Sequence, residues 1–86
     1  MYRVTYTVEA QATRDALSHE RQQLLDQGLA VLAKDPYHEA TTHVGINEAD
    51  RKAQVAPGIM IEYLIAHALM VVAVIEVFDD SLIAHV

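Results

Sequence analysis

The beginning of the chain alternates between apolar and polar positions, the apolar ones being Tyr2, Val4, Tyr6 and Val8. A period of two in β-branched and aromatic residues is typical of a half-buried strand. Residues 10–34 change to a helical period, with a stripe formed by Leu24, Leu25, Gly28, Leu29 and Leu32. This segment predicts two helices in a hairpin, broken near Ser18–His19, or one bent helix, with Ser18 or Thr13 as an N-cap. Asp35-Pro36 ends it, because a residue before proline disfavours the α conformation.

The remaining residues predict four strands separated by turn signals. The first two are His43–Ile46 and Arg51–Ala56, and Pro57-Gly58 forms a strong turn pair after them. Two longer apolar strands follow, residues 59–65 and 69–78, joined at Ala66-His67-Ala68. The order β-α-α-β-β-β-β predicts one α+β domain over residues 1–86, with a helical hairpin packed on one face of a mainly antiparallel sheet.

The composition indicates a globular protein, since 52% of the 86 residues are hydrophobic and 21% are charged. The chain has no cysteine, which excludes a disulfide scaffold, a cysteine-based zinc site and a thiol nucleophile. The first residues lack the layout of a signal peptide, and the longest uncharged run, 63–75, is too short to span a bilayer. We therefore expect a soluble cytoplasmic protein.

The charge balance disfavours nucleic acid as a partner. The net charge is −6, and no Lys or Arg follows Lys52. Proteins that hold phosphates usually present a basic patch, because cation–phosphate contacts supply most of the affinity. Arg51 and Lys52 are the local exception and are the candidate RNA contacts, although an ordinary solvated turn is the alternative. As neighbours on a strand they point to opposite faces.

The order of elements and their punctuation resemble the RelE/ParE superfamily of toxins from type II toxin–antitoxin systems. The resemblance covers residues 2 to about 80 and rests on the opening strand 2–6, the helical region ending Leu32-Ala33-Lys34-Asp35-Pro36, the Pro57-Gly58-x-x-x-x-Tyr63 segment, and the apolar strand 71–77. It implies a small fold silenced by an antitoxin. In this superfamily the RelE-like branch cuts mRNA in the ribosomal A site, and the ParE-like branch inhibits DNA gyrase.

The chain departs from that pattern at the positions that carry charge in the RNA-cutting branch. Where such toxins often read Gly-Tyr-Arg-x-x-Tyr or Gly-x-Arg-x-Arg-Tyr, this chain has Gly58-Ile59-Met60-Ile61-Glu62-Tyr63, and Gln54 stands where another basic residue is common. A unit charge at about 4 Å is worth roughly 4 kcal/mol at an effective dielectric of 20, so a glutamate beside a phosphate is costly. The usual set of basic catalytic residues is therefore missing.

Four residues are the candidates for catalysis in its place. Strand alternation allows Glu62 and Glu76 to share one face, where they could form a general base; the alternative is isolated acids on a solvated or partner-facing surface. His85 resembles the terminal acid or base of RNA-cutting relatives, and its alternative is a frayed end. His43 is the fourth candidate. It also forms a loop pair with His38, which is too weak a signal for a metal, so we predict neither a metal nor a cofactor.

The predicted sheet presents apolar side chains on both faces, whereas the helices can cover only one. The face opposite the helices is expected to carry Met60, Leu64, Met70, Val72 and Val74. An exposed apolar surface of this kind commonly marks a partner site. An antitoxin, a second copy of the chain, or both would fit it.

Three functional interpretations follow. The first is a toxin neutralised by a cognate antitoxin, with ribosome-dependent cleavage of mRNA as its activity. The second is a non-catalytic binding module that keeps the fold and the partner surface. The third is an unrelated small homodimeric α+β protein. In each interpretation, a one-residue slip in the strand register around Met60–Glu62 would move every side chain of that strand to the other face of the sheet.

Overall fold

The computed structural model describes residues 1–37, 42–43 and 50–82. Within them the elements follow one another as β1 (Arg3–Tyr6), α1 (Val8–Ala16), α2 (His19–Leu32), β2 (Thr42–His43), β3 (Asp50–Ala56), β4 (Ile59–Ala66), η1 (His67–Leu69), β5 (Val71–Asp79) and η2 (Asp80–Leu82), η denoting a 3-10 helix. The strands form one five-stranded sheet in the order β1-β5-β4-β3-β2. Only β1 and β5 are parallel; the other pairs are antiparallel. The predicted α+β class and the mainly antiparallel sheet are therefore confirmed.

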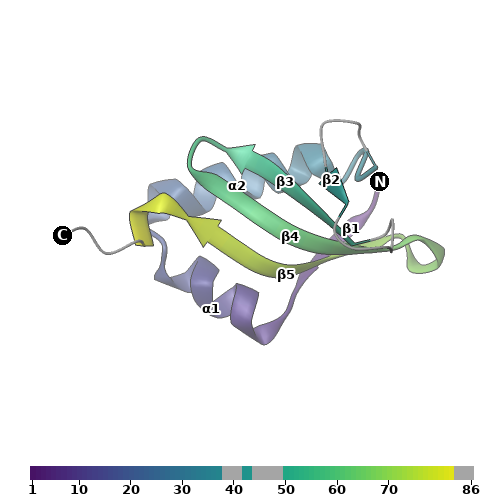
Figure 1. Ribbon diagram of the computed structural model, residues 1–86, viewed down its shortest axis with the longest axis horizontal. Coiled ribbons are helices and arrows are strands. Elements are labelled where there is room, and N and C mark those ends of the chain that lie inside the picture. The colour runs from purple at the N-terminus through teal and green to yellow at the C-terminus, as the bar shows by residue number, and fades with distance from the viewer. Residues whose placement is uncertain (38–41, 44–49, 83–86) are drawn as a thin grey trace.

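Both helices contribute to a core on the same side of the sheet. In Figure 1, α2 passes behind β3 and β4, and α1 lies beside β5. An ion pair between Arg14 and Asp26, 2.7 Å between Nη2 and Oδ2, connects the two helices. The broad surface of β3, β4 and β5 that faces away from α2 has no helix over it among the described residues.

The helix starts are set by two hydroxyl caps. The side chain of Ser18 accepts a hydrogen bond from the Arg21 amide, as predicted, and the two helices are separated at Leu17–Ser18. Thr7, and not Thr13, caps α1 by accepting from the Ala10 amide. The alternating pattern was therefore extended too far, because a capped helix begins at Val8.

No helix in the described part of the chain is long and apolar enough to cross a membrane.

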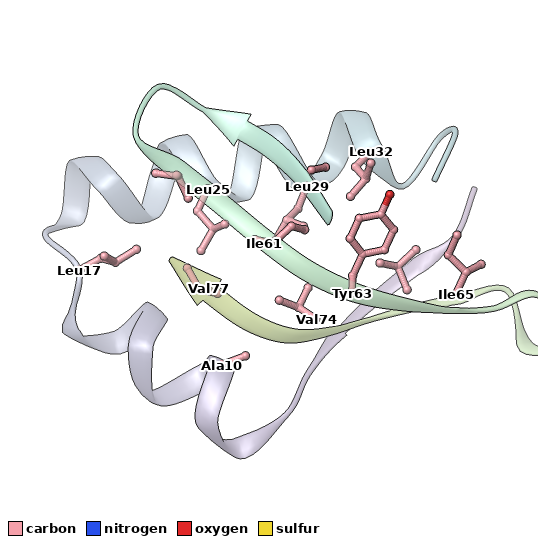
Figure 2. Close-up of a cluster of buried hydrophobic side chains, with 13 residues drawn as sticks. Ala10, Leu17, Leu25, Leu29, Leu32, Ile61, Tyr63, Ile65, Val74 and Val77 are labelled. Carbon is pink, nitrogen blue, oxygen red and sulfur yellow. The ribbon is translucent and has the colours of Figure 1, made fainter. Parts of the chain in front are cut away.

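The core forms between the leucines of α2 and the inner side chains of β4. Figure 2 shows Leu25, Leu29 and Leu32 on the same side of the sheet as Ile61 and Tyr63. Tyr63 is fully buried, and its hydroxyl donates a 2.8 Å hydrogen bond to the Pro36 carbonyl. The hydroxyl therefore connects β4 to the segment that follows α2, and Tyr63 is part of the core.

A β-bulge changes which face β5 presents. Glu62 pairs with Glu76, but the next residue of β4, Tyr63, pairs with Val74, so Ile75 has no partner across the strand. Residues before the bulge and after it therefore alternate in opposite phase. Val72 and Val74 are 0% exposed and pack in the core, whereas Glu76 and Phe78 point outward. The expectation that Val72 and Val74 lie on the uncovered face with Met60 is wrong, because it assumed unbroken alternation.

Met70 is also outside the row of strand residues to which it was assigned. It ends η1 with a positive φ of 53° and precedes the first residue of β5, Val71. Its side chain is exposed, but it belongs to the turn between β4 and β5 and not to the sheet.

Candidate functional site

The helix-free surface of the sheet, called the outer face below, is built by the residues that alternate away from the core on three strands. On β4 these are Met60, Glu62 and Leu64, as predicted, since Ile59, Ile61, Tyr63 and Ile65 are buried. The strand register adds their neighbours, because paired residues share a face. The outer face thus includes Asp50, Lys52, Gln54, Met60, Glu62, Leu64, Ala73, Glu76 and Phe78.

A row of charges crosses the middle of the outer face. Lys52 lies opposite Glu62, and Glu62 lies opposite Glu76, so Glu62 and Glu76 do share a face. Burial raises the pKa of Glu62, the neighbouring carboxylates of Asp50 and Glu76 raise this pKa further, and Lys52 lowers it. Among the described residues, the Oδ1 atom of Asp50 is buried and has no hydrogen-bond partner. The carboxylates of Asp50 and Glu76 therefore disfavour the ionised form of Glu62.

Lys52 is the cation of this surface, but it is already engaged. Its Nζ atom lies 5.7 Å from the centre of the Phe78 ring, within the range of a cation–π contact. It also lies opposite Glu62 in the register. One partly neutralised lysine among three carboxylates does not make a basic phosphate site.

Arg51 lies on the other side of the strand. It pairs with the buried Tyr63, it is only 8% exposed, and its guanidinium carbon lies 5.5 Å from the centre of the Tyr37 ring. The prediction that Arg51 and Lys52 face opposite ways is confirmed. A guanidinium so deeply buried does not present its donors to an RNA backbone, so Arg51 does not belong to the candidate surface.

The predicted histidines are not brought to the outer face by anything the structure describes. His43 belongs to β2, where its backbone pairs with Arg51, and both His38 and His85 lie outside the described residues. His67 is exposed in η1, where its ring forms a hydrogen bond with the Tyr2 hydroxyl and an edge contact with Tyr37. No group of three or more His, Asp or Glu side chains suited to a metal ion occurs in the described ranges.

One polar cluster has no counterpart in the sequence analysis. The Asp79 side chain is fully buried at the end of β5 and accepts hydrogen bonds from Arg21 Nε and Nη2, each 3.2 Å long. Burial alone would raise the pKa of Asp79, but the bonds from Arg21 and from Ser81 hold it below its ordinary value. Arg21 also donates to the Pro57 carbonyl, so the cluster joins α2, the β3–β4 turn and β5. The sequence signal for this cluster was Asp79 itself, an acid at a position of the apolar strand β5 that falls in the same alternation as its buried residues.

No protein-family model matches the sequence, and no curated protein matches it either. Solved structures do match the fold. The isolated E. coli RelE toxin superposes with a TM-score of 0.79 at 21% identity, over 92% of this chain and 84% of that one. The toxin in the intact E. coli RelBE toxin–antitoxin complex gives the same TM-score and identity, over 92% and 96%. The RelBE2 toxin–antitoxin complex of Mycobacterium tuberculosis gives 0.77 at 15% identity, over 91% and 96%.

These matches extend over nearly the whole chain and include both helices and the sheet. At identities of 15–21% these matches establish the architecture. The chemistry of the outer face has to be inferred from this chain's own residues. The chain has the fold of the RelE toxins.

Proposed function

We propose that this protein is the toxin component of a type II toxin–antitoxin pair and that a cognate antitoxin neutralises it. The observation that carries the proposal is the whole-chain fold match to RelE toxins, two of them in complexes with their antitoxins. The apolar side chains on the outer face support a protein partner as well. Met60, Leu64 and Phe78 are 43%, 37% and 43% exposed, which is unusual for large apolar side chains grouped on one surface.

The proposal is tested by inducing the chain in a bacterial host, alone and together with the protein encoded by the adjacent gene. We expect growth arrest with the chain alone, relief of the arrest on co-expression, and co-purification of the two proteins. Leu29→Asp is the control, because it places a charge in the core and removes the folded protein without touching the outer face.

Normal growth with confirmed soluble protein would contradict the toxin assignment. Co-purification of a partner would then favour the non-catalytic binding module. A dimer in sedimentation equilibrium, with no partner captured, would favour the small homodimeric protein.

Ribosome-dependent cleavage of mRNA is a second candidate function, favoured by one observation. Glu62 has a raised pKa and lies opposite Lys52, and a carboxylate with a pKa closer to neutrality is a better general base. In this proposal Glu62 takes the proton from the attacking 2′-hydroxyl, Lys52 contacts the phosphate, and Glu76, His43 and His85 are candidates for the remaining proton transfers.

Primer extension on ribosome-bound mRNA after induction tests this activity. The nuclease proposal predicts new ends in the A site, reduced about a hundredfold by Glu62→Gln, since removing a general base commonly costs that much. Variants Glu76→Gln, His43→Ala and His85→Ala sort the remaining roles. Growth arrest without new mRNA ends would contradict the nuclease proposal and indicate gyrase or another target.

A further inference from the structure

The outer face carries both carboxylates and large exposed apolar side chains. Glu62 and Glu76 lie in the row that crosses its middle, and the carboxylate of Asp50 lies beside that row. Met60 and Phe78 are paired across β4 and β5 on one side of the carboxylate row, and Leu64 lies opposite Asp50 on the other. The surface is therefore apolar, acidic and apolar again along the direction of the strands.

The carboxylates also determine what this surface does not attract. An RNA backbone would place phosphates against Glu62 and Glu76, where Lys52 is the cation of the row. A second copy of the chain docked through the same face would bring its own three carboxylates against these, in a protein that already carries a net charge of −6. Both occupants would bring negative charge to a surface on which three carboxylates share one lysine, Lys52.

We propose that the outer face binds a segment of a partner protein that carries Lys or Arg among apolar residues. Its apolar side chains would cover Met60, Leu64 and Phe78, and its cations would meet Glu62 and Glu76. This inference rests on the proposed function, in which the partner is the antitoxin, and it specifies the chemistry of the antitoxin segment and the face that receives it. A cation over the row also ends the mutual repulsion of the carboxylates.

Two synthetic peptides of sixteen residues test the chemistry directly, with the full chain labelled for NMR. Both carry the same leucine stripe, and their polar positions are lysine in one and glutamate in the other. We expect saturable shifts confined to β3, β4 and β5 with the lysine peptide and none with the glutamate peptide. Glu62→Gln/Glu76→Gln should weaken the lysine peptide about tenfold, because two charge contacts are lost.

The matched control is Asp15→Asn/Glu20→Gln, which removes two exposed acids from the helices and the same net charge. It should leave the affinity unchanged. Equal weakening by the control, shifts centred on the helices, or equal binding of both peptides would overturn the proposal.

Co-purification from cells separates this inference from the function on which it rests. If the partner co-purifies with Glu62→Lys/Glu76→Lys as well as with the unmodified chain, the outer face is not its binding site and the toxin assignment stands. If the unmodified chain causes no arrest and captures no partner, the proposed function fails, and the peptide titration still decides what the outer face binds.

Discussion

At the scale of single residues, Glu62 is the acid of the outer face whose pKa is raised by its surroundings. It lies on a strand between Lys52 and Glu76, with Asp50 beside it. Its protonated form is therefore favoured by folding, which lowers the stability of the protein whenever Glu62 is ionised. Perturbed pKa values of this kind cluster at binding and catalytic sites.

Glu62→Gln should increase the free energy of unfolding near pH 7 by about 0.5 kcal/mol, the usual size of a like-charge cross-strand effect. The gain should shrink as the pH falls from the raised pKa of Glu62 toward its ordinary value of 4.5, because the unmodified side chain then becomes neutral in both states. Urea unfolding at about pH 7 and about pH 4 measures it.

Asp35→Asn, an exposed acid beyond α2, is the comparison for this experiment and should change stability little at either pH. A gain for Glu62→Gln that is equal at both pH values would show that protonation of Glu62 is not its cause.

At the scale of elements, α2 approaches β3 so closely that one position admits only glycine. A Cβ atom at Gly28 would lie 2.2 Å from the Val55 carbonyl oxygen and 2.7 Å from the Val55 Cβ. Gly28 lowers the helix propensity of α2, but it lets the helix rest directly on the strand backbone. The position of α2 over the sheet therefore depends on a missing side chain.

Gly28→Ala should destabilise the protein by about 2 kcal/mol, although alanine is the better helix former, because the overlap forces helix and strand apart. Gln27→Ala, on the exposed side of the same helix, should be nearly neutral. Thermal unfolding of both variants measures the difference. A Gly28→Ala variant more stable than the original would mean that α2 and β3 separate readily.

The ion pairs Arg14–Asp26 and Arg21–Asp79, each of which joins two elements, offer a second comparison at this scale. Arg14 and Arg21 have equally accessible side chains, 24% each, but the partner Asp26 is 48% exposed and the partner Asp79 is 0% exposed. A buried carboxylate that loses its cation keeps its desolvation cost, whereas an exposed one is solvated by water.

Arg21→Met should therefore cost about 2–3 kcal/mol near neutral pH, and Arg14→Met less than about 1 kcal/mol. The pKa of Asp79 is held below its ordinary value of 3.8. The contribution of the Arg21–Asp79 pair to stability is therefore fully present above pH 3.8 and is lost as the pH falls through the lowered pKa. Denaturant unfolding of both variants tests the ranking. Equal costs would show that burial of Asp79 does not matter.

The sequence allowed most elements to be predicted because their patterns are local. The Ser18 cap, the Pro57-Gly58 turn and the alternation of β4 each depend on a few neighbouring residues, and all three were found. The start of α1 was missed because Thr7 and Val8 satisfy a strand pattern and a capped helix equally well. The Arg21–Asp79 pair was missed because it joins residues that are 58 positions apart.

The outer face could be predicted in part for the same reason. Alternation placed Met60, Glu62 and Leu64 together, but pairing between strands decides which residues of β3 and β5 join them. The position of Ile75 outside the pairing is a property of two strands and not of one. Val72 and Val74 were therefore assigned to the wrong face, while Glu76 was assigned to the correct one.

At the scale of the whole molecule, the fold and the charge support different inferences. The architecture matches RelE toxins along nearly the full chain, whereas the net charge of −6 and the carboxylates of the outer face oppose contact with a phosphate backbone. A protein partner reconciles the two, because it can provide cations and apolar surface together. The charge of the outer face thus favours a protein over a phosphate backbone as its ligand.

We expect no saturable binding of a 20-nucleotide RNA to the unmodified chain below about 100 µM at physiological salt. Glu62→Arg/Glu76→Arg should bring the affinity into the micromolar range and add a salt dependence, because it builds a basic row with Lys52. Asp15→Arg/Glu20→Arg changes the net charge equally on the helices and should gain less. Fluorescence anisotropy at two salt concentrations distinguishes them, and tight binding by the unmodified chain would contradict the expectation.

The bulge at Ile75 also affects how this chain is compared with its relatives. When the equivalent strand of another protein lacks the extra residue, the alignment needs a gap at Ile75. Without that gap, Glu76 and Phe78 would be aligned with the positions of Val77 and Asp79. Deleting Ile75 would impose the same exchange on the protein itself and would carry Asp79 away from Arg21. Ile75, in the middle of β5, therefore keeps the outer-face residues and the buried Arg21–Asp79 ion pair on their correct faces.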